Sequence, residues 1–255
     1  MIPILYQDAA CIAVCKPAGM LVHRSAIDRH ETVFLMQTVR DQIGRHVFPV
    51  HRLDRPTSGV MLFAFDAATA RELAQQFEAR EVEKTYWAVV RGWTDDSGRI
   101  DYPLKEQLDP LSDALADPDK AAQSAVTDYR TLARAELPFV TQARHATSRY
   151  SWLEITPHTG RKHQIRRHLK HIFHPIVGDT SHGDLAQNHA VAAFCGNNRL
   201  LLHARSLSFT SPDSGQFVNA IAEPDDAWQR VTAALVGQKL KQKTIANTVK
   251  CLSEN

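Results

Sequence analysis

The pattern of apolar and polar positions predicts a chain with more strands than helices. Short apolar or alternating runs, which are typical of strands, occur at residues 2–6, 11–15, 60–65, 84–91, 127–132, 151–155, 200–209 and 217–221. The polar turn between the first two runs predicts a β-hairpin, and residues 212–215 predict a turn between the last two. Many strands with few intervening helices favour an α+β domain with a mixed, largely antiparallel sheet and flanking helices.

Helical spacing is found in fewer places. Residues 36–43 form one candidate helix, and Asp66 is a typical N-cap for a second that runs to about Arg80. A last helix begins after Asp225 or Asp226. The core-facing stripes of the second and last helices are Ala70, Leu73, Ala74 and Phe77, and Trp228, Val231 and Leu235. Residues 104–124 combine acids and turn formers without periodicity, which predicts an exposed excursion.

The composition says more about the cellular compartment of the protein than about its chemical function. The 255 residues carry a net charge of only +2, so the overall charge does not indicate a nucleic-acid partner. The sequence has neither an apolar run long enough to cross a bilayer nor a secretory leader, so we expect no membrane association. Four cysteines without a CxxC pair or a disulfide framework indicate a reducing compartment. We therefore expect a cytoplasmic protein.

The positive charge is concentrated in one segment. No acidic residue occurs from Ile155 to Gly178, and the cations of this span are Arg161, Lys162, Arg166, Arg167 and Lys170. If the segment is helical, Ile165, Leu169 and Ile172 anchor it to the core, which places Arg166 at the flank and turns Arg167 and His163 outward. Solvated basic helices are common, but so long a span without acids favours an anionic partner such as a phosphate backbone.

Asp54 is the residue best placed for chemistry. It lies between Arg52 and Arg55, just before the buried run at 60–65, and Pro56 and Gly59 shape the intervening loop. Flanking cations lower the pKa of a carboxyl group and keep it ionised. The residues alone equally allow a surface ion pair that closes a turn.

Metal and cofactor sites are not predicted. His168, His171 and His174 recur at every third position, but no cysteine or carboxylate lies close enough to complete a ligand set. The sequence also lacks the glycine-rich nucleotide-binding motifs, HExxH and GxSxG. We expect neither a metal nor a cofactor.

Five ordered segments carry a resemblance to a known family. His51-Arg52-Leu53-Asp54 followed by Pro56-Thr57-Ser58-Gly59 resembles the catalytic motif of the RluA family of pseudouridine synthases. The other segments that resemble family motifs are residues 16–23 (KPAGMLVH), Lys84-Thr85-Tyr86, residues 159–166 (TGRKHQIR) with 174–179 (HPIVGD), and Leu201-Leu202-His203-Ala204. The resemblance spans residues 4 to 222, or most of the chain.

The resemblance implies a pseudouridine synthase fold with a central catalytic cleft, formed by residues 1–236 without an N-terminal S4-type domain, and a polar tail at 237–255. It implies isomerisation of uridine in RNA without a cofactor. Asp54 would be the nucleophile and Arg166 its ion-pair partner, while Tyr86 would stack on the flipped base and help manage the proton leaving C5. Leu202 would pack against the site. The expected RNA contacts are Arg52, Arg55, Arg161, Lys162, His163, Arg167 and Lys170.

The choice of RNA rests on finer features. Residues 21–25, 36–44 and 74–78 resemble a branch of the family that acts on uridine 65 of certain tRNAs. Ribosomal RNA is the alternative substrate, because such enzymes share every catalytic residue. A non-catalytic RNA-binding or folding factor is the alternative from another class. We expect a monomer, because no apolar stripe is left without a use in the core.

Overall fold

The computed structural model describes residues 1–23, 31–107, 121–141, 145–196 and 198–236. Most of the expected excursion at 104–124 and the whole of the expected tail therefore lie outside the described residues. In the described part, no helix is long and apolar enough to span a membrane.

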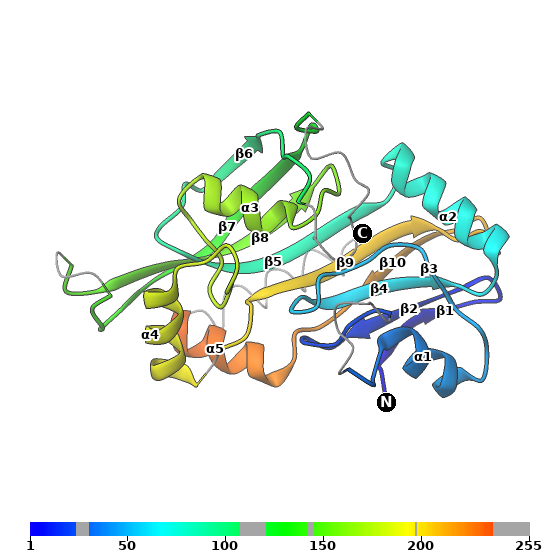
Figure 1. Ribbon diagram of the computed structural model, residues 1–255, viewed down its shortest axis with the longest axis horizontal. Coiled ribbons are helices and arrows are strands. Elements are labelled where there is room, and N and C mark those ends of the chain that lie inside the picture. The colour runs from blue at the N-terminus through cyan, green and yellow to red at the C-terminus, as the bar shows by residue number, and fades with distance from the viewer. Residues whose placement is uncertain (24–30, 108–120, 142–144, 197, 237–255) are drawn as a thin grey trace, which may run out of the picture.

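The described strands form one mixed sheet with the predicted antiparallel character (Figure 1). In spatial order its main path is β1 (Ile4–Gln7), β2 (Cys11–Lys16), β4 (Ser58–Ala64), β9 (Leu202–Thr210), β5 (Glu83–Arg91), β8 (Ser148–Pro157), β7 (Val126–Leu137) and β6 (Ser97–Asp101). Two further strands, β10 (Phe217–Ile221) and β3 (Phe48–Pro49), pair with β9 and β4. Every pairing is antiparallel except that of β4 with β9.

Helices cover both faces of the half of the sheet that contains β4. Side chains alternate between the faces of a strand, so Leu62 packs with Leu73 of α2 (Ala67–Ala79) on one side. On the other side Met61 and Phe63 pack with Leu35 of α1 (Leu35–Ile43). The continuous apolar run of β4 therefore reflects burial on both faces.

The half that contains β5 and β8 is covered in the same way. Val90 of β5 packs against Ile165 and Leu169 of α3 (Gln164–His171), as the predicted helical stripe requires. The opposite face packs against α4 (Leu185–Cys195) and α5 (Asp226–Val236), where Val191 and Trp228 are buried. In Figure 1, α3 lies over β7 and β8, whereas α4 and α5 lie together at the other side of the sheet.

The two halves meet at the short parallel contact of β4 with β9, where Ser58 pairs with His203 and Gly59 with Ala204. Gly59 has φ +114, and a Cβ atom there would lie 2.1 Å from the carbonyl oxygen of Ala204. Only glycine permits so close an approach of two backbones. The close packing of these two backbones therefore explains why a glycine follows the Asp54 loop.

Most predicted boundaries are confirmed within a few residues. Asp66 caps α2 by accepting a hydrogen bond from the amide of Thr69 at 2.8 Å, and Asp225 accepts one from the amide of Trp228 at 2.9 Å. The sequence pattern missed β3, β6 and α4, and it predicted β7 and β8 too short. The apolar residues of α4 form no single stripe, and the outer parts of β7 carry charged side chains, so neither shows clear periodicity.

Candidate active site

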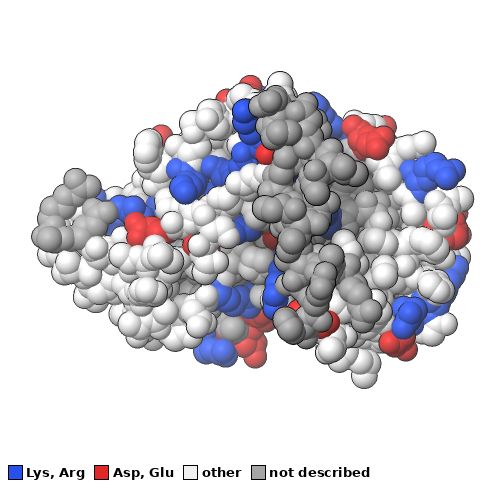
Figure 2. All heavy atoms as spheres, in the orientation of Figure 1, with Lys and Arg blue, Asp and Glu red and all other residues white. Residues whose placement is uncertain are grey.

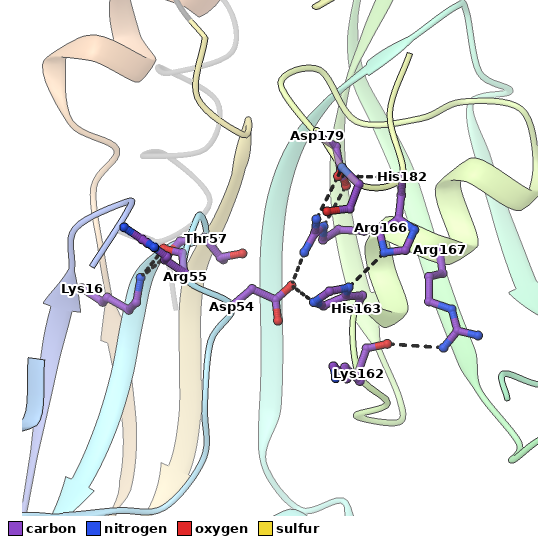
Figure 3. Close-up of polar contacts among 11 residues, drawn as sticks. Lys16, Asp54, Arg55, Thr57, Lys162, His163, Arg166, Arg167, Asp179 and His182 are labelled. Carbon is purple, nitrogen blue, oxygen red and sulfur yellow. Dashed lines mark hydrogen bonds and ion pairs between the residues drawn. The ribbon is translucent and has the colours of Figure 1, made fainter. Parts of the chain in front are cut away.

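Asp54 lies on the loop between β3 and β4, at the seam where the two halves of the sheet meet. The loop is tied by a hydrogen bond from the amide of Thr57 to the carbonyl oxygen of Asp54 at 3.0 Å, and Leu53 is buried beneath it. The side chain of Asp54 keeps 23% of its surface exposed. Figure 3 shows this side chain pointing from its loop towards α3. A partly exposed carboxylate is thus held on a fixed loop.

Arg166 of α3 binds Asp54 and is itself held by a second carboxylate. Its Nη1 donates to Oδ2 of Asp54 at 2.9 Å, while Nε and Nη2 donate to the two oxygens of Asp179 at 2.7 and 2.8 Å. Only 4% of the Arg166 side chain and 1% of the Asp179 side chain are exposed. The bidentate pair fixes the plane of the guanidinium, so Arg166 meets Asp54 in one orientation.

Backbone amides complete the support of Asp179. Its Oδ1 accepts hydrogen bonds from the amides of Ser181 and His182, each at 2.9 Å. Burial works to raise the pKa of Asp179, but the Arg166 hydrogen bonds and the His182 amide outweigh it and the pKa is lowered. Burial likewise works to lower the pKa of Arg166, yet the bonds to Asp179 and Asp54 raise it. All the charges of this pair are therefore retained.

His163 also faces Asp54, which corrects the expectation that it points outward. Its Nε2 lies 3.7 Å from Oδ2 of Asp54, and its Nδ1 shares a 2.9 Å hydrogen bond with Nε2 of His182. His163 precedes α3 in the left-handed conformation, with φ 56, and this turns the ring back across the start of the helix. Burial lowers the pKa of both rings, that of His182 to about 4. Arg167, by contrast, points away from Asp54 as predicted (Figure 3).

Lys16, which sequence reasoning did not select, supports the loop from below. It is fully buried, and its Nζ donates to the carbonyl oxygens of Pro17, Arg55 and Thr57 at 3.0, 2.9 and 2.8 Å. Two of these carbonyls belong to residues that follow Asp54 in its loop. Burial lowers the pKa of Lys16 to about 7, against the opposing effect of the Asp54 charge.

The arginines that flank Asp54 do not pair with it. Arg55 donates to the carbonyl oxygen of Gly19 at 3.1 Å and pairs with Glu31, and Arg52 is exposed. The expected local positive field is thus replaced by contacts from Arg166, which lies 112 residues away in the chain. The alternative of a surface ion pair between Asp54 and its neighbours is not what the structure shows.

Tyr86 and Leu202 lie in neighbouring strands beside the site. Both belong to the cluster that packs under α3, with Leu202 buried and Tyr86 half-buried. Burial, and to a smaller extent the charge of Asp54, raises the pKa of Tyr86. The phenol is therefore protonated at neutral pH.

His203 of the Leu-Leu-His-Ala segment has a structural role that the sequence did not reveal. It is 1% exposed, and its Nδ1 and Nε2 are hydrogen-bonded to Oγ of Ser58 at 2.9 Å and to the carbonyl oxygen of Ala222 at 3.0 Å. Burial lowers the pKa of His203, so the ring is neutral. It ties β9 to the residue that begins β4 and so to the end of the Asp54 loop.

The remaining predicted RNA contacts lie just before α3 and on it. Arg161 and Lys162 are exposed and donate to the carbonyl oxygens of Ser124 and Gln107 at 3.2 and 2.9 Å, and Lys170 is exposed on the helix. Buried Gln164 fixes the loop before the helix by accepting hydrogen bonds from the Thr159 hydroxyl and the Arg161 amide. Figure 2 shows cationic and anionic side chains mixed over one face, so the basic character is local.

The evenly spaced histidines are used structurally. His168 is hydrogen-bonded to the Thr127 hydroxyl and to the carbonyl oxygen of Tyr102, His171 stacks on the ring of Tyr102, and His174 is bonded to the carbonyl oxygen of Arg91. No cluster of three or more His, Cys, Asp or Glu suited to a metal ion occurs among the residues that the structure describes.

This fold has counterparts in known proteins. Residues 10–171 match the family model described as RNA pseudouridylate synthase, and the chain belongs to this family. Of solved structures, human RNA pseudouridylate synthase domain containing 1 aligns with a TM-score of 0.70 at 22% identity, covering 100% of this chain and 96% of that one. Human RNA pseudouridylate synthase domain containing 4 aligns with a TM-score of 0.66 at 25% identity, over 91% and 92% of the two chains.

More similar relatives carry a narrower name. The chain is 58% identical over 225 residues to tRNA pseudouridine synthase C of Pasteurella multocida, covering 88% of this chain and 92% of the relative. It is 54% identical to tRNA pseudouridine synthase C of Haemophilus influenzae, over 91% and 96% of the two chains. The protein of that name in Vibrio cholerae is 55% identical, over 90% and 93%.

Proposed function

We propose that the protein isomerises uridine to pseudouridine in tRNA, with uridine 65 as the target. The observation that carries the proposal is the Asp54 carboxylate, held through one oxygen by buried Arg166 and partly open to solvent. The names of its close relatives support tRNA as the substrate. The choice of uridine 65 rests on the resemblance of residues 21–25, 36–44 and 74–78 to one branch of the family.

The reaction breaks the N1–C1′ bond of uridine, turns the base and forms a C5–C1′ bond. A proton leaves C5 and N1 gains one, so the atoms balance without a cofactor. Asp54 acts as the nucleophile, and its Oδ1 accepts no hydrogen bond from any residue in the described part of the chain. Arg166 occupies Oδ2 and orients the carboxylate through a charge-assisted hydrogen bond.

Asp179 gives Arg166 a carboxylate partner that does not depend on the charge of Asp54. An arginine that bound only Asp54 would be freed whenever the nucleophile formed a covalent bond and lost its charge. The bidentate bond to Asp179 holds Arg166 in place throughout the reaction. We therefore assign Asp179 as a positioning residue that acts through Arg166.

Tyr86 and Leu202 shape the place of the base. Tyr86 stacks on the flipped uracil, and Leu202 packs beside it in the same apolar cluster. The raised pKa of Tyr86 keeps its phenol protonated, which favours stacking over a role as the base that takes the C5 proton.

RNA binding supplies the energy for base flipping. Extruding a base from a helix costs a few kcal/mol. The exposed cations Arg52, Arg161, Lys162 and Lys170, with Arg167, offset this cost by contacting phosphates. Binding of the RNA should then weaken steeply as the salt concentration rises. Affinity that does not change with salt would remove these residues from the interface.

The test is tritium release from transcripts labelled at C5 of uridine, with the modified position mapped by primer extension after carbodiimide treatment. Release from unmodified tRNA with a single stop at uridine 65 supports the proposal in full. Release only from ribosomal RNA keeps the chemistry and replaces the substrate. Release from neither RNA, with Asp54→Asn equal to wild type in every assay, supports a non-catalytic RNA-binding factor.

We also propose that residues 1–236 form the catalytic unit and that the protein acts in the cytoplasm as a monomer. Deletion of residues 237–255 should leave the rate of tritium release within about twofold of wild type. Light scattering of the full chain should give the mass of one subunit. A dimer mass, or loss of release on deletion, would contradict these points separately.

A further inference from the structure

A groove opens beside the candidate active site, where β5 and β8 separate. The first residues of β5 pair only with β9, as Lys84 does with Leu207. Pairing of β5 with β8 begins at Tyr86, opposite Ile155. Between the unpaired edge of β5 and the end of β8 lies a groove of about 580 Å³. Its lining includes Arg80, Lys84, Thr85, Arg99, Thr156 and His158.

Two of the cations in this lining have no carboxylate partner among the residues that the structure describes. Arg99 binds Asp128 through two hydrogen bonds at 2.7 and 2.8 Å, and His158 contacts the same carboxylate at 2.8 Å. Lys84 and Arg80 form no ion pair or side-chain hydrogen bond with any residue in the described ranges. The exposed Glu83, which also lines the groove, forms no ion pair there either.

Of the two cations, Lys84 points more strongly to an anionic ligand, because it is half-buried. Its Nζ lies 5.9 Å from the centre of the Phe77 ring. Burial lowers the pKa of Lys84. Holding a cation in such a place without a carboxylate costs stability, unless an anion from outside the chain occupies the groove.

On both sides, the residues that line the groove lie close in the chain to elements of the active site. Lys84 lies two residues before Tyr86 on the same strand, and alternate residues of a strand share a face. The opposite wall includes Thr159, which leads through Arg161 to His163 and α3. An RNA strand that leaves the reacting uridine along β5 therefore passes through this groove.

We propose that the groove binds a phosphodiester of the substrate RNA strand beside the reacting uridine, through the ammonium of Lys84 and the guanidinium of Arg80. This rests on the proposed function and adds a substrate contact outside the basic segment at 155–178. The hydroxyls of Thr85 and Thr156 lie in the same lining and suit the sugar and phosphate oxygens.

Charge-removing variants test this contact. Lys84→Gln removes the ammonium, and Arg80→Asn removes the guanidinium while suiting the left-handed backbone at this position, where φ is 64. Each should weaken binding of the tRNA transcript about fivefold to tenfold at low salt. Each should also lower the slope of log affinity against log salt by about 0.7 to 0.9, the value for one phosphate contact.

Two further variants separate charge recognition from a structural role. Lys84→Arg keeps the charge and should restore both the affinity and the salt slope of wild type. Arg230→Gln removes one charge from an exposed position of α5 and should match wild type. The rate of tritium release at saturating RNA should stay within about twofold for Lys84→Gln, since the contact serves binding.

The phosphate itself is located with RNAs that carry one neutral methylphosphonate linkage at successive positions around the target uridine. Wild type should lose affinity at each linkage that it contacts, and at one of these Lys84→Gln should show no further loss. Equal losses for both proteins at every linkage, or a salt slope for Lys84→Gln equal to that of Arg230→Gln, would overturn the proposal. Tritium release by wild type is measured alongside, so failure of the proposed function is seen separately.

Discussion

Asp54 is held from two sides by different kinds of contact. On the α3 side Arg166 binds its side chain through charge, in a buried pair with Asp179. On the β2 side Lys16 binds the loop through backbone carbonyls and never contacts the carboxylate. The first side sets the direction of the nucleophile's side chain, and the second sets the position of its loop. Substitutions on the two sides should therefore fail in different ways.

The largest effect is expected for Arg166→Lys. Lysine keeps the charge but cannot bind Asp54 and both oxygens of Asp179 at once, because it lacks the planar fork of donors. The rate of tritium release under single-turnover conditions should fall about 10³-fold. Arg134→Lys is the matched control. Arg134 lies on β7 and pairs with Asp96, and this variant should release tritium at the wild-type rate. A loss below tenfold for Arg166→Lys would mean that charge alone is enough on the α3 side.

A smaller loss is expected for Asp179→Asn, which leaves the contact of Arg166 with Asp54 but replaces one of the two acceptor oxygens by an NH2 group and removes the charge. Release should fall about 10- to 100-fold through misplacement of the nucleophile. The free energy of unfolding should fall by about 3 kcal/mol, because a buried pair loses one charge. Asp184→Asn, in the more exposed pair with Arg91, should lower activity less than twofold. Equal activity losses for the two variants would argue against a positioning role.

The contacts of Lys16 on the β2 side should affect the free energy of unfolding and its dependence on pH. The pKa of Lys16 is lowered to about 7 in the folded chain from an ordinary value of 10.5, so the unfolded chain binds more protons between these values. Stability contributed at this site therefore rises as the pH rises from about 7. In this range the free energy of unfolding of wild type should rise by about 1 kcal/mol per pH unit more than that of Lys16→Met.

Urea unfolding at pH 7, 8 and 9 measures this difference. Lys16→Met also leaves three carbonyl oxygens without their donor, so it should be less stable than wild type at every pH in this range. Parallel stability curves for the two proteins would contradict the titration of Lys16. In that case Lys16 would contribute to stability only through its hydrogen bonds to the loop.

The sequence predicted the parts of the site that depend on local spacing. The stripe of Ile165 and Leu169 placed Arg166 correctly at the flank of a helix, and the loop before a buried strand placed Asp54. The strand order, the seam between β4 and β9 and the pairing of Asp54 with Arg166 join distant segments, and only the family resemblance pointed to that pair.

The rest of the site could not be predicted from local patterns. Lys16 and Asp179 act through contacts that span 41 and 13 residues, and nothing in their spacing indicates burial. His163 was placed wrongly because its position was derived from a regular helix, whereas the residue has the left-handed conformation that precedes α3. The partial overlap of β5 with β8, which opens the groove at Lys84, depends on strand register alone.

The most direct test of the central claim is single-turnover tritium release by Asp54→Asn at saturating enzyme. This variant should fold normally, because Arg166 keeps its pair with Asp179, and it should bind the tRNA transcript as tightly as wild type. No release above background is expected under these conditions. Release within tenfold of the wild-type rate would contradict the assignment of Asp54 as the nucleophile.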